Sequence, residues 1–96
     1  MQNRSKSITK KSESMRETID YIEGKVMPLV YEASFGENQG IELYSNLRYE
    51  VGLDSFDFIS LIIEVEKEFG ICITDEECED ISTPEDLINL VFEKTR

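Results

Sequence analysis

The sequence predicts an all-α fold, a four-helix bundle with a short third helix and a long loop between the first and second helices. Several segments carry apolar residues at steps of three and four, a spacing that gathers them on one face of a helix. Residues typical of helix starts precede these segments, and no pair of strand-like segments is present. With 96 residues, the chain has room for one small domain.

The first helix is predicted to begin at Ser14. Ser14 and Glu17 have the spacing of a capping box, in which each side chain satisfies a free backbone N–H of the first turn. A continuous helical stripe follows, made of Met15, Ile19, Ile22, Val26 and Leu29. Pro28 is expected to kink or end this helix, because it lacks an N–H. Residues 34–53, with three glycines and scattered apolar side chains, are then expected to form a long structured loop.

The second helix is predicted to start after a capping Asp54, to run through Phe69 and to stop at Gly70. At about 100° per residue, one side of it collects the expected core face: Phe58, Leu61, Ile62, Val65 and Phe69. The opposite side is polar, with Asp57, Ser60, Glu64, Lys67 and Glu68. Two large apolar residues, Phe56 and Ile63, lie among these charges.

The third and fourth helices are marked by their first residues. Thr74 and Glu77 form a second capping box, so a short helix is expected over residues 75–80. Thr83 followed by Pro84 predicts the start of the last helix, since proline is tolerated at the first helical position. The apolar face of that helix is supplied by Leu87, Ile88, Val91 and Phe92.

Charge is unevenly distributed along the chain. Residues 1–12 hold four bases and no acid, and their polar composition predicts a disordered basic tail, an interpretation favoured over an organellar transit peptide. Residues 13–96, the single folded domain, hold 21 acids against six bases. The whole chain carries a net charge of −11, which repels nucleic-acid phosphates and anionic lipids and attracts basic partners. We expect no nucleic-acid partner and no membrane partner.

The composition argues against an enzyme. Without histidine, Ser/His and Cys/His catalysis and His-ligated zinc are excluded within this chain. Two cysteines, Cys72 and Cys78, are too few for a zinc site and are interpreted as small core residues, because no basic neighbour is evident to lower a thiol pKa. One disulfide is possible, but the lack of a secretory signal favours a reduced, cytoplasmic chain.

No metal site is expected. Asp75, Glu77 and Glu79 occupy the first, third and fifth positions of a trial calcium loop. The sixth position holds Asp80 where the sharp turn requires glycine, and Pro84 starts a helix inside the would-be loop.

Ser55 is the candidate site residue. It lies just inside the N-terminus of the second helix, directly after Asp54, where the helix dipole presents partial positive charge. A phosphate attached to its hydroxyl would be stabilised there. Position alone favours an ordinary first-turn residue, so the neighbouring residues decide the interpretation.

Those neighbours resemble the phosphopantetheine attachment motif of the acyl carrier protein family. Residues 52–57, Gly-Leu-Asp-Ser-Phe-Asp, are similar to the family's Gly-x-Asp-Ser-Leu followed by an acidic helix. Residues 59–71 resemble its second helix, residues 73–77 the start of its third, and residues 81–87 its Ile-x-Thr-x-x-Asp start of the last. The resemblance covers about residues 47–92.

The sequence departs from the family pattern at Phe56, where leucine is usual, at Ser60 and Lys67, where acids are common, and at Thr74, which replaces a proline. Asp-Ser-Phe occurs in some carriers of aminoacyl groups, notably D-alanyl carriers. Three alternatives therefore stay open. The chain is a fatty-acid or polyketide-like acyl carrier, an aminoacyl or peptidyl carrier loaded by an adenylating enzyme, or an unmodified acidic helical adaptor.

The resemblance implies a cytoplasmic, monomeric carrier that is not itself an enzyme. A phosphopantetheinyl transferase would attach 4'-phosphopantetheine to Ser55, and the thiol of that arm would carry acyl groups as thioesters. In this family the acyl chain can also tuck between helices, here beside Phe58, Ile62 and Val65. Acyl-loading and acyl-processing enzymes with basic docking surfaces would recognise a face made of Asp54, Phe56, Asp57, Ile63, Glu64 and Glu68.

Overall fold

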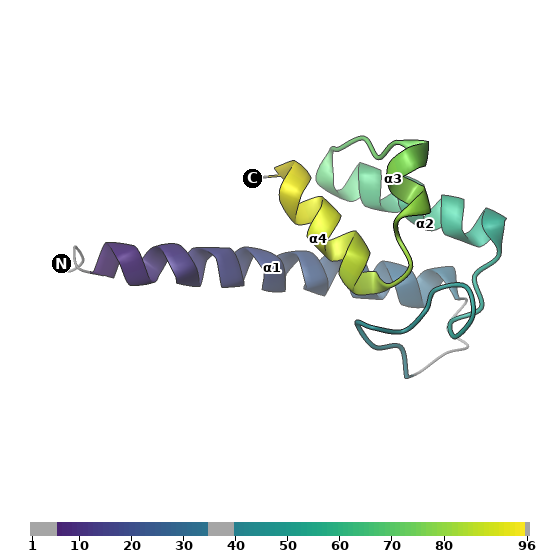
Figure 1. Ribbon diagram of the computed structural model, residues 1–96, viewed down its shortest axis with the longest axis horizontal. Coiled ribbons are helices and arrows are strands. Elements are labelled where there is room, and N and C mark those ends of the chain that lie inside the picture. The colour runs from purple at the N-terminus through teal and green to yellow at the C-terminus, as the bar shows by residue number, and fades with distance from the viewer. Residues whose placement is uncertain (1–5, 35–39, 96) are drawn as a thin grey trace.

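The computed structural model describes residues 6–34 and 40–95, and for residues 6–16 the backbone alone. Its four helices are α1 (Lys6–Ala33), α2 (Ser55–Phe69), α3 (Asp75–Glu79) and α4 (Pro84–Thr95). Helices α2 and α4 both pack against α1, and α1 extends beyond this bundle toward the N-terminus (Figure 1). Regular structure in the described residues is entirely helical, which confirms the predicted fold class.

The core forms where the C-terminal half of α1 meets the other helices and the loop before α2. It is wholly apolar at its centre, so burial of hydrocarbon surface is the main stabilising force of the bundle. The side chains that are almost entirely buried are Ile22, Val26, Val30, Leu47, Leu61, Val65, Leu87 and Val91.

Helix α1 is longer than the sequence predicted. It begins at Lys6 rather than Ser14, so the helix includes residues 6–12 of the segment expected to be a tail, while residues 1–5 lie outside the described part of the chain. No glycine or proline occurs between Lys6 and Glu23, so a helix nucleated in the bundle can propagate toward the N-terminus.

Pro28 does not end the helix, because α1 continues past it to Ala33. The carbonyl that loses its partner belongs to Gly24, and both Gly24 and Pro28 are exposed, so water can bind that carbonyl. On the other side of α1, Val26 and Val30 are fully buried. Burial of one valine before and one after the proline therefore outweighs the lost backbone hydrogen bond.

Helix α2 follows its prediction closely. It begins after Asp54 as N-cap and ends at Gly70, which has a left-handed conformation with φ 66°. Four of its five predicted core residues are buried, whereas Phe69, at the last position, is half-buried. Helix α4 begins with Pro84 as predicted, and Thr83 Oγ1 accepts the Asp86 N–H at 3.1 Å.

The loop before α2 is structured over its described residues 40–54, and it belongs to the core. Leu47 is fully buried, its N–H donates to the Ser82 carbonyl at 2.8 Å, and its own carbonyl accepts the Leu53 N–H at 2.9 Å. A further bond runs from the Glu85 N–H to the Leu43 carbonyl at 3.0 Å. The bonds to Ser82 and from Glu85 join the loop to the residues before α4 and to its first turn.

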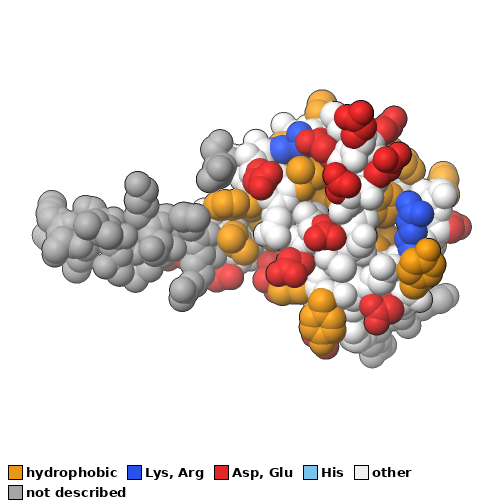
Figure 2. All heavy atoms as spheres, viewed as in Figure 1, with side chains coloured by type: hydrophobic (Ala, Val, Ile, Leu, Met, Phe, Trp, Pro, Cys, Tyr) orange, Lys and Arg blue, Asp and Glu red, His pale blue; other side chains and the backbone are white. Residues whose placement is uncertain are grey.

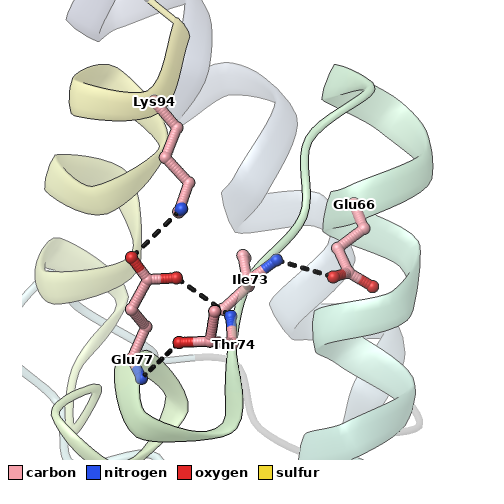
Figure 3. A network of polar contacts seen from close by, with 5 residues as sticks. All are labelled: Glu66, Ile73, Thr74, Glu77 and Lys94. Atoms are coloured by element: carbon pink, nitrogen blue, oxygen red, sulfur yellow. Dashed lines mark hydrogen bonds and ion pairs between the residues drawn. The ribbon is translucent and has the colours of Figure 1, made fainter.

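Helix α3 makes several polar contacts, and none of its own residues is fully buried. Figure 3 shows Glu77 accepting the Thr74 N–H at 2.9 Å in the predicted capping box and pairing with Lys94 of α4 at 3.0 Å. Before the helix, the Ile73 N–H donates to the Glu66 carboxylate of α2 at 2.7 Å. A carboxylate of α2 and an ammonium group of α4 thus contact α3 and the residue just before its N-cap.

Leu47→Ala should lower the free energy of unfolding by about 2–5 kcal/mol, because it removes buried hydrocarbon and leaves a cavity in the core. Tyr49→Ala is the matched control, since Tyr49 lies in the same loop but is 87% exposed. Urea unfolding measures both variants. Equal urea midpoints for the two variants would show that Leu47 does not contribute to the core.

Glu77→Gln should lower the thermal midpoint at neutral pH. The Thr74 N–H, and after it the Lys94 ammonium, hold the pKa of Glu77 below its ordinary value. A depressed carboxyl pKa stabilises the fold above the unfolded pKa, and this contribution is lost as pH falls through the folded pKa. The difference from wild type should therefore shrink on acidification. Glu76→Gln, at an exposed position of α3, controls for general charge removal, and a pH-independent difference would refute this account.

Candidate functional site

Ser55 is the first residue of α2, and it is exposed. The capping of this helix start is carried by its neighbours, because Asp54 Oδ1 accepts the Asp57 N–H at 2.8 Å and the Asp57 carboxylate faces the Asp54 N–H at 3.5 Å. Among the described residues nothing hydrogen-bonds the Ser55 hydroxyl. The hydroxyl is therefore accessible and uncommitted at the positive end of a helix dipole.

The chain reaches Ser55 through a sharp turn at Gly52. Its φ of 88° lies in the left-handed region, where glycine avoids the strain that a side chain would bring. On either side of it, Val51 and Leu53 are buried. These two buried side chains anchor the backbone on both sides of Gly52. The residues that follow, Asp54 and Ser55, are exposed to solvent.

Asn46 organises the loop before this turn. Its side-chain carbonyl accepts the N–H groups of Arg48 at 3.0 Å and Tyr49 at 2.8 Å, and its backbone carbonyl accepts those of Glu50 and Val51. Its own N–H donates to the Glu50 carboxylate at 2.6 Å. Sequence reasoning missed this residue, although asparagine is common in turns because its side chain imitates a backbone acceptor.

The predicted recognition residues lie along one side of α2. Phe56 and Ile63 are 76% and 44% exposed, and Asp54, Glu64 and Glu68 are exposed as well, whereas Asp57 is half-buried by its capping role. The structure adds Ile59, which is 48% exposed and was not predicted.

Two of the carboxylates on this face lie near a lysine that partly neutralises their charge. Glu68 lies 3.9 Å from Lys25 of α1, and Glu64 lies 3.9 Å from Lys67. Ion pairs at this exposure and distance contribute little and are easily exchanged for another cation. Acidic side chains also outnumber basic ones over the bundle surface seen in Figure 2. The face can therefore accept a basic partner.

Two hollows flank the start of α2. A groove of about 370 Å³ between α1 and α2 is lined by Leu29, Glu32, Ala33, Phe56, Asp57, Ser60, Leu61 and Glu64. A second hollow of about 220 Å³ between α2 and α3 is lined by Arg48, Ser55, Phe58, Ile59, Asp75, Cys78 and Glu79. Of the residues expected beside a tucked acyl chain, Phe58 lines the second hollow, while Ile62 and Val65 are buried in the core.

The two cysteines lie in different environments, and that of Cys78 disfavours a thiolate. Cys78 is half-buried, and burial, followed by the charges of Asp75, Glu66 and Glu77, raises the pKa of its thiol. Cys72 is exposed rather than a core residue, because the chain turns its neighbour Ile73 inward. Over the described ranges 6–34 and 40–95, no cluster of three metal-ligating side chains is found and no helix is long and apolar enough to span a membrane.

The comparisons with known proteins identify the family. The model of the phosphopantetheine attachment site family matches residues 35–91, which include the whole of α2 and α3 and most of α4. The chain belongs to the acyl carrier protein family.

Similar acyl carrier proteins come from several bacteria. The acyl carrier protein of Chloroherpeton thalassium is 35% identical over 79 residues, which cover 82% of this chain and 99% of that protein. One from Rickettsia bellii is 31% identical over 75 residues, covering 78% and 87%. A solved structure described as an acyl carrier protein of Mycobacterium tuberculosis superposes with a TM-score of 0.65 at 26% identity, covering 71% of this chain and 90% of that one.

As an acyl carrier protein, the chain has covalent 4'-phosphopantetheine as its cofactor and carries acyl groups on it. It serves the enzymes of acyl synthesis as a carrier. The family resemblance predicted from the sequence is therefore confirmed.

Proposed function

We propose that Ser55 is the residue that bears the phosphopantetheine arm. The observation that carries the proposal is an exposed hydroxyl, free of hydrogen bonds within the described residues, in the first turn of α2 and inside the matched region. A phosphodiester fits this position, because the helix start offers partial positive charge to an anion. When bound, the arm supplies the thiol that holds the acyl group as a thioester.

The chain's own residues hold and present this site. Asp54 and Asp57 cap α2 through their side chains, which leaves the Ser55 oxygen available to a transferase. Gly52 and the buried Leu53 fix the direction in which Ser55 projects. The raised pKa of the Cys78 thiol and the absence of histidine support a chain that performs no catalysis itself.

We also propose that partner enzymes dock on the face of α2 defined by Asp54, Phe56, Asp57, Ile63, Glu64 and Glu68. These partners are a phosphopantetheinyl transferase and acyl-loading and acyl-processing enzymes with basic surfaces. The net charge of −11 supports this choice and argues against nucleic acid and anionic membranes. A monomer in the cytoplasm fits the role of a shuttle, and the exposed thiol of Cys72 suits a reducing compartment.

An aminoacyl or peptidyl cargo is the second candidate. It rests on Phe56, which is 76% exposed next to Ser55 and matches the Asp-Ser-Phe of some aminoacyl carriers. The names of the similar proteins favour an acyl cargo over this alternative and over an unmodified adaptor.

Ser55→Ala should abolish modification. Incubation of the wild-type chain with coenzyme A and a promiscuous transferase should add the mass of one phosphopantetheine, measured on the intact protein. Ser60→Ala, on the next turn of α2, should be modified like the wild type. A modified Ser55→Ala protein would overturn the assignment.

Charge reversal on the docking face should slow association with the transferase. Glu64→Lys and Glu68→Lys should reduce the on-rate several-fold at low salt, because electrostatic steering acts on encounter, and the wild-type rate should fall as salt rises. Ile63→Ala should instead raise the off-rate, since it removes an apolar contact. Glu93→Lys, exposed on α4, is the charge control for stopped-flow measurements. Equal slowing by Glu93→Lys would show that net charge acts rather than this face.

A further inference from the structure

We propose that Arg48 binds the phosphodiester of the arm and positions it on the α3 side of Ser55. The proposal rests on the attachment to Ser55 proposed above. Arg48 acts as a positioning residue for the attached group, and no part of the family resemblance assigns it a role.

The first observation is that Arg48 lacks the acidic partner that the other described cations have. Ion pairs join Lys25 to Glu68, Lys67 to Glu64 and Lys94 to Glu77. Within the described side chains, no carboxylate lies in ion-pair distance of Arg48, although 21 acids stand in the sequence. Its guanidinium is therefore available to an anion that is added later.

The second observation is where Arg48 lies. It lines the same hollow of about 220 Å³ as Ser55. Its guanidinium carbon is 5.8 Å from the centre of the Phe58 ring, a cation–π contact. Phe58 stands three residues after Ser55, so the two residues share one side of the first turn of α2. The contact places the guanidinium beside the residue one turn after Ser55, in the hollow that all three residues line.

The third observation is that Arg48 extends from a well-fixed backbone. Asn46 binds the Arg48 N–H, the adjacent Leu47 is fully buried, and the Leu47 N–H donates to the Ser82 carbonyl. Binding an anion then orders only the end of the side chain, which lowers the entropy cost.

The charged residues that line the two hollows differ, and Arg48 makes the hollow between α2 and α3 the more favourable one for a phosphodiester. The groove between α1 and α2 is lined by Glu32, Asp57 and Glu64 and by no cation. The hollow between α2 and α3 holds two carboxylates, Asp75 and Glu79, together with Arg48. A phosphodiester is repelled on the first side, whereas on the second a guanidinium can bind two of its oxygens at once.

The test compares apo and modified forms of the wild type, Arg48→Gln and Arg48→Lys, each confirmed by intact mass. Lys67→Gln is the control, because it removes the same charge from an exposed position on α2. In the wild type, modification should shift the Arg48 side-chain N–H signal in NMR spectra and slow its exchange with water. Modification should also raise the thermal midpoint of the wild type and of Lys67→Gln.

Arg48→Gln should lose this gain in midpoint, and Arg48→Lys should keep part of it, because a lysine retains the charge without the paired donors. A wild type that is modified while its Arg48 signal stays unchanged would overturn the Arg48 proposal and leave Ser55 intact. An Arg48→Gln protein that keeps the full gain would overturn it as well. A wild type that the transferase leaves unmodified would overturn the Ser55 assignment, and the Arg48 proposal with it.

Discussion

The placement of Ser55 depends on the burial of a single loop side chain, Leu47. This residue is fully buried in the common core, and its two backbone groups bond to Ser82, just before α4, and to Leu53, just before the cap of α2. One residue therefore links the core to the starts of two helices. Because the same link fixes the direction in which the chain enters α2, the exposure of Ser55 is a consequence of core packing rather than of local helix propensity.

The elements that sequence reasoning predicted well are those that local chemistry determines. The capping box of Thr74 and Glu77 and the Thr83-Pro84 pair mark helix starts in the structure as in the sequence, because the bonds that they form span three residues. The course of α1 was predicted less well, both before Ser14 and beyond Pro28. Beyond Pro28, the helix depends on the burial of Val26 and Val30 in the core, which a local sequence pattern does not report. Before Ser14, it depends on propagation from the part of α1 that packs in the bundle.

At the site, too, the features that local sequence determines were predicted and those that depend on tertiary contacts were not. Ser55 was found from its place at a helix start and from the resemblance of its neighbours to the family motif. The acidic face of α2 follows from helical periodicity, which reports on every residue of a regular element. Asn46 and Arg48 lie in a loop whose shape is set by side-chain to backbone bonds, and periodicity contains no information on such bonds. Ile59 was missed for a different reason. It lies near the edge of the apolar stripe, where only the actual neighbours decide whether a side chain is covered.

The two sides of α2 differ in how they are stabilised, and the difference bears on the proposed position of the arm. Toward α1, the helix packs through fully buried apolar side chains. Toward α3, the neighbouring helix itself buries no residue fully, and Glu66 of α2 accepts the N–H of Ile73 just before it. A short helix with few buried side chains of its own opens at a lower free energy than a packed apolar core. The hollow that contains Ser55 and Arg48 thus adjoins the side of α2 on which the neighbouring helix buries no residue fully, rather than the side that packs against α1.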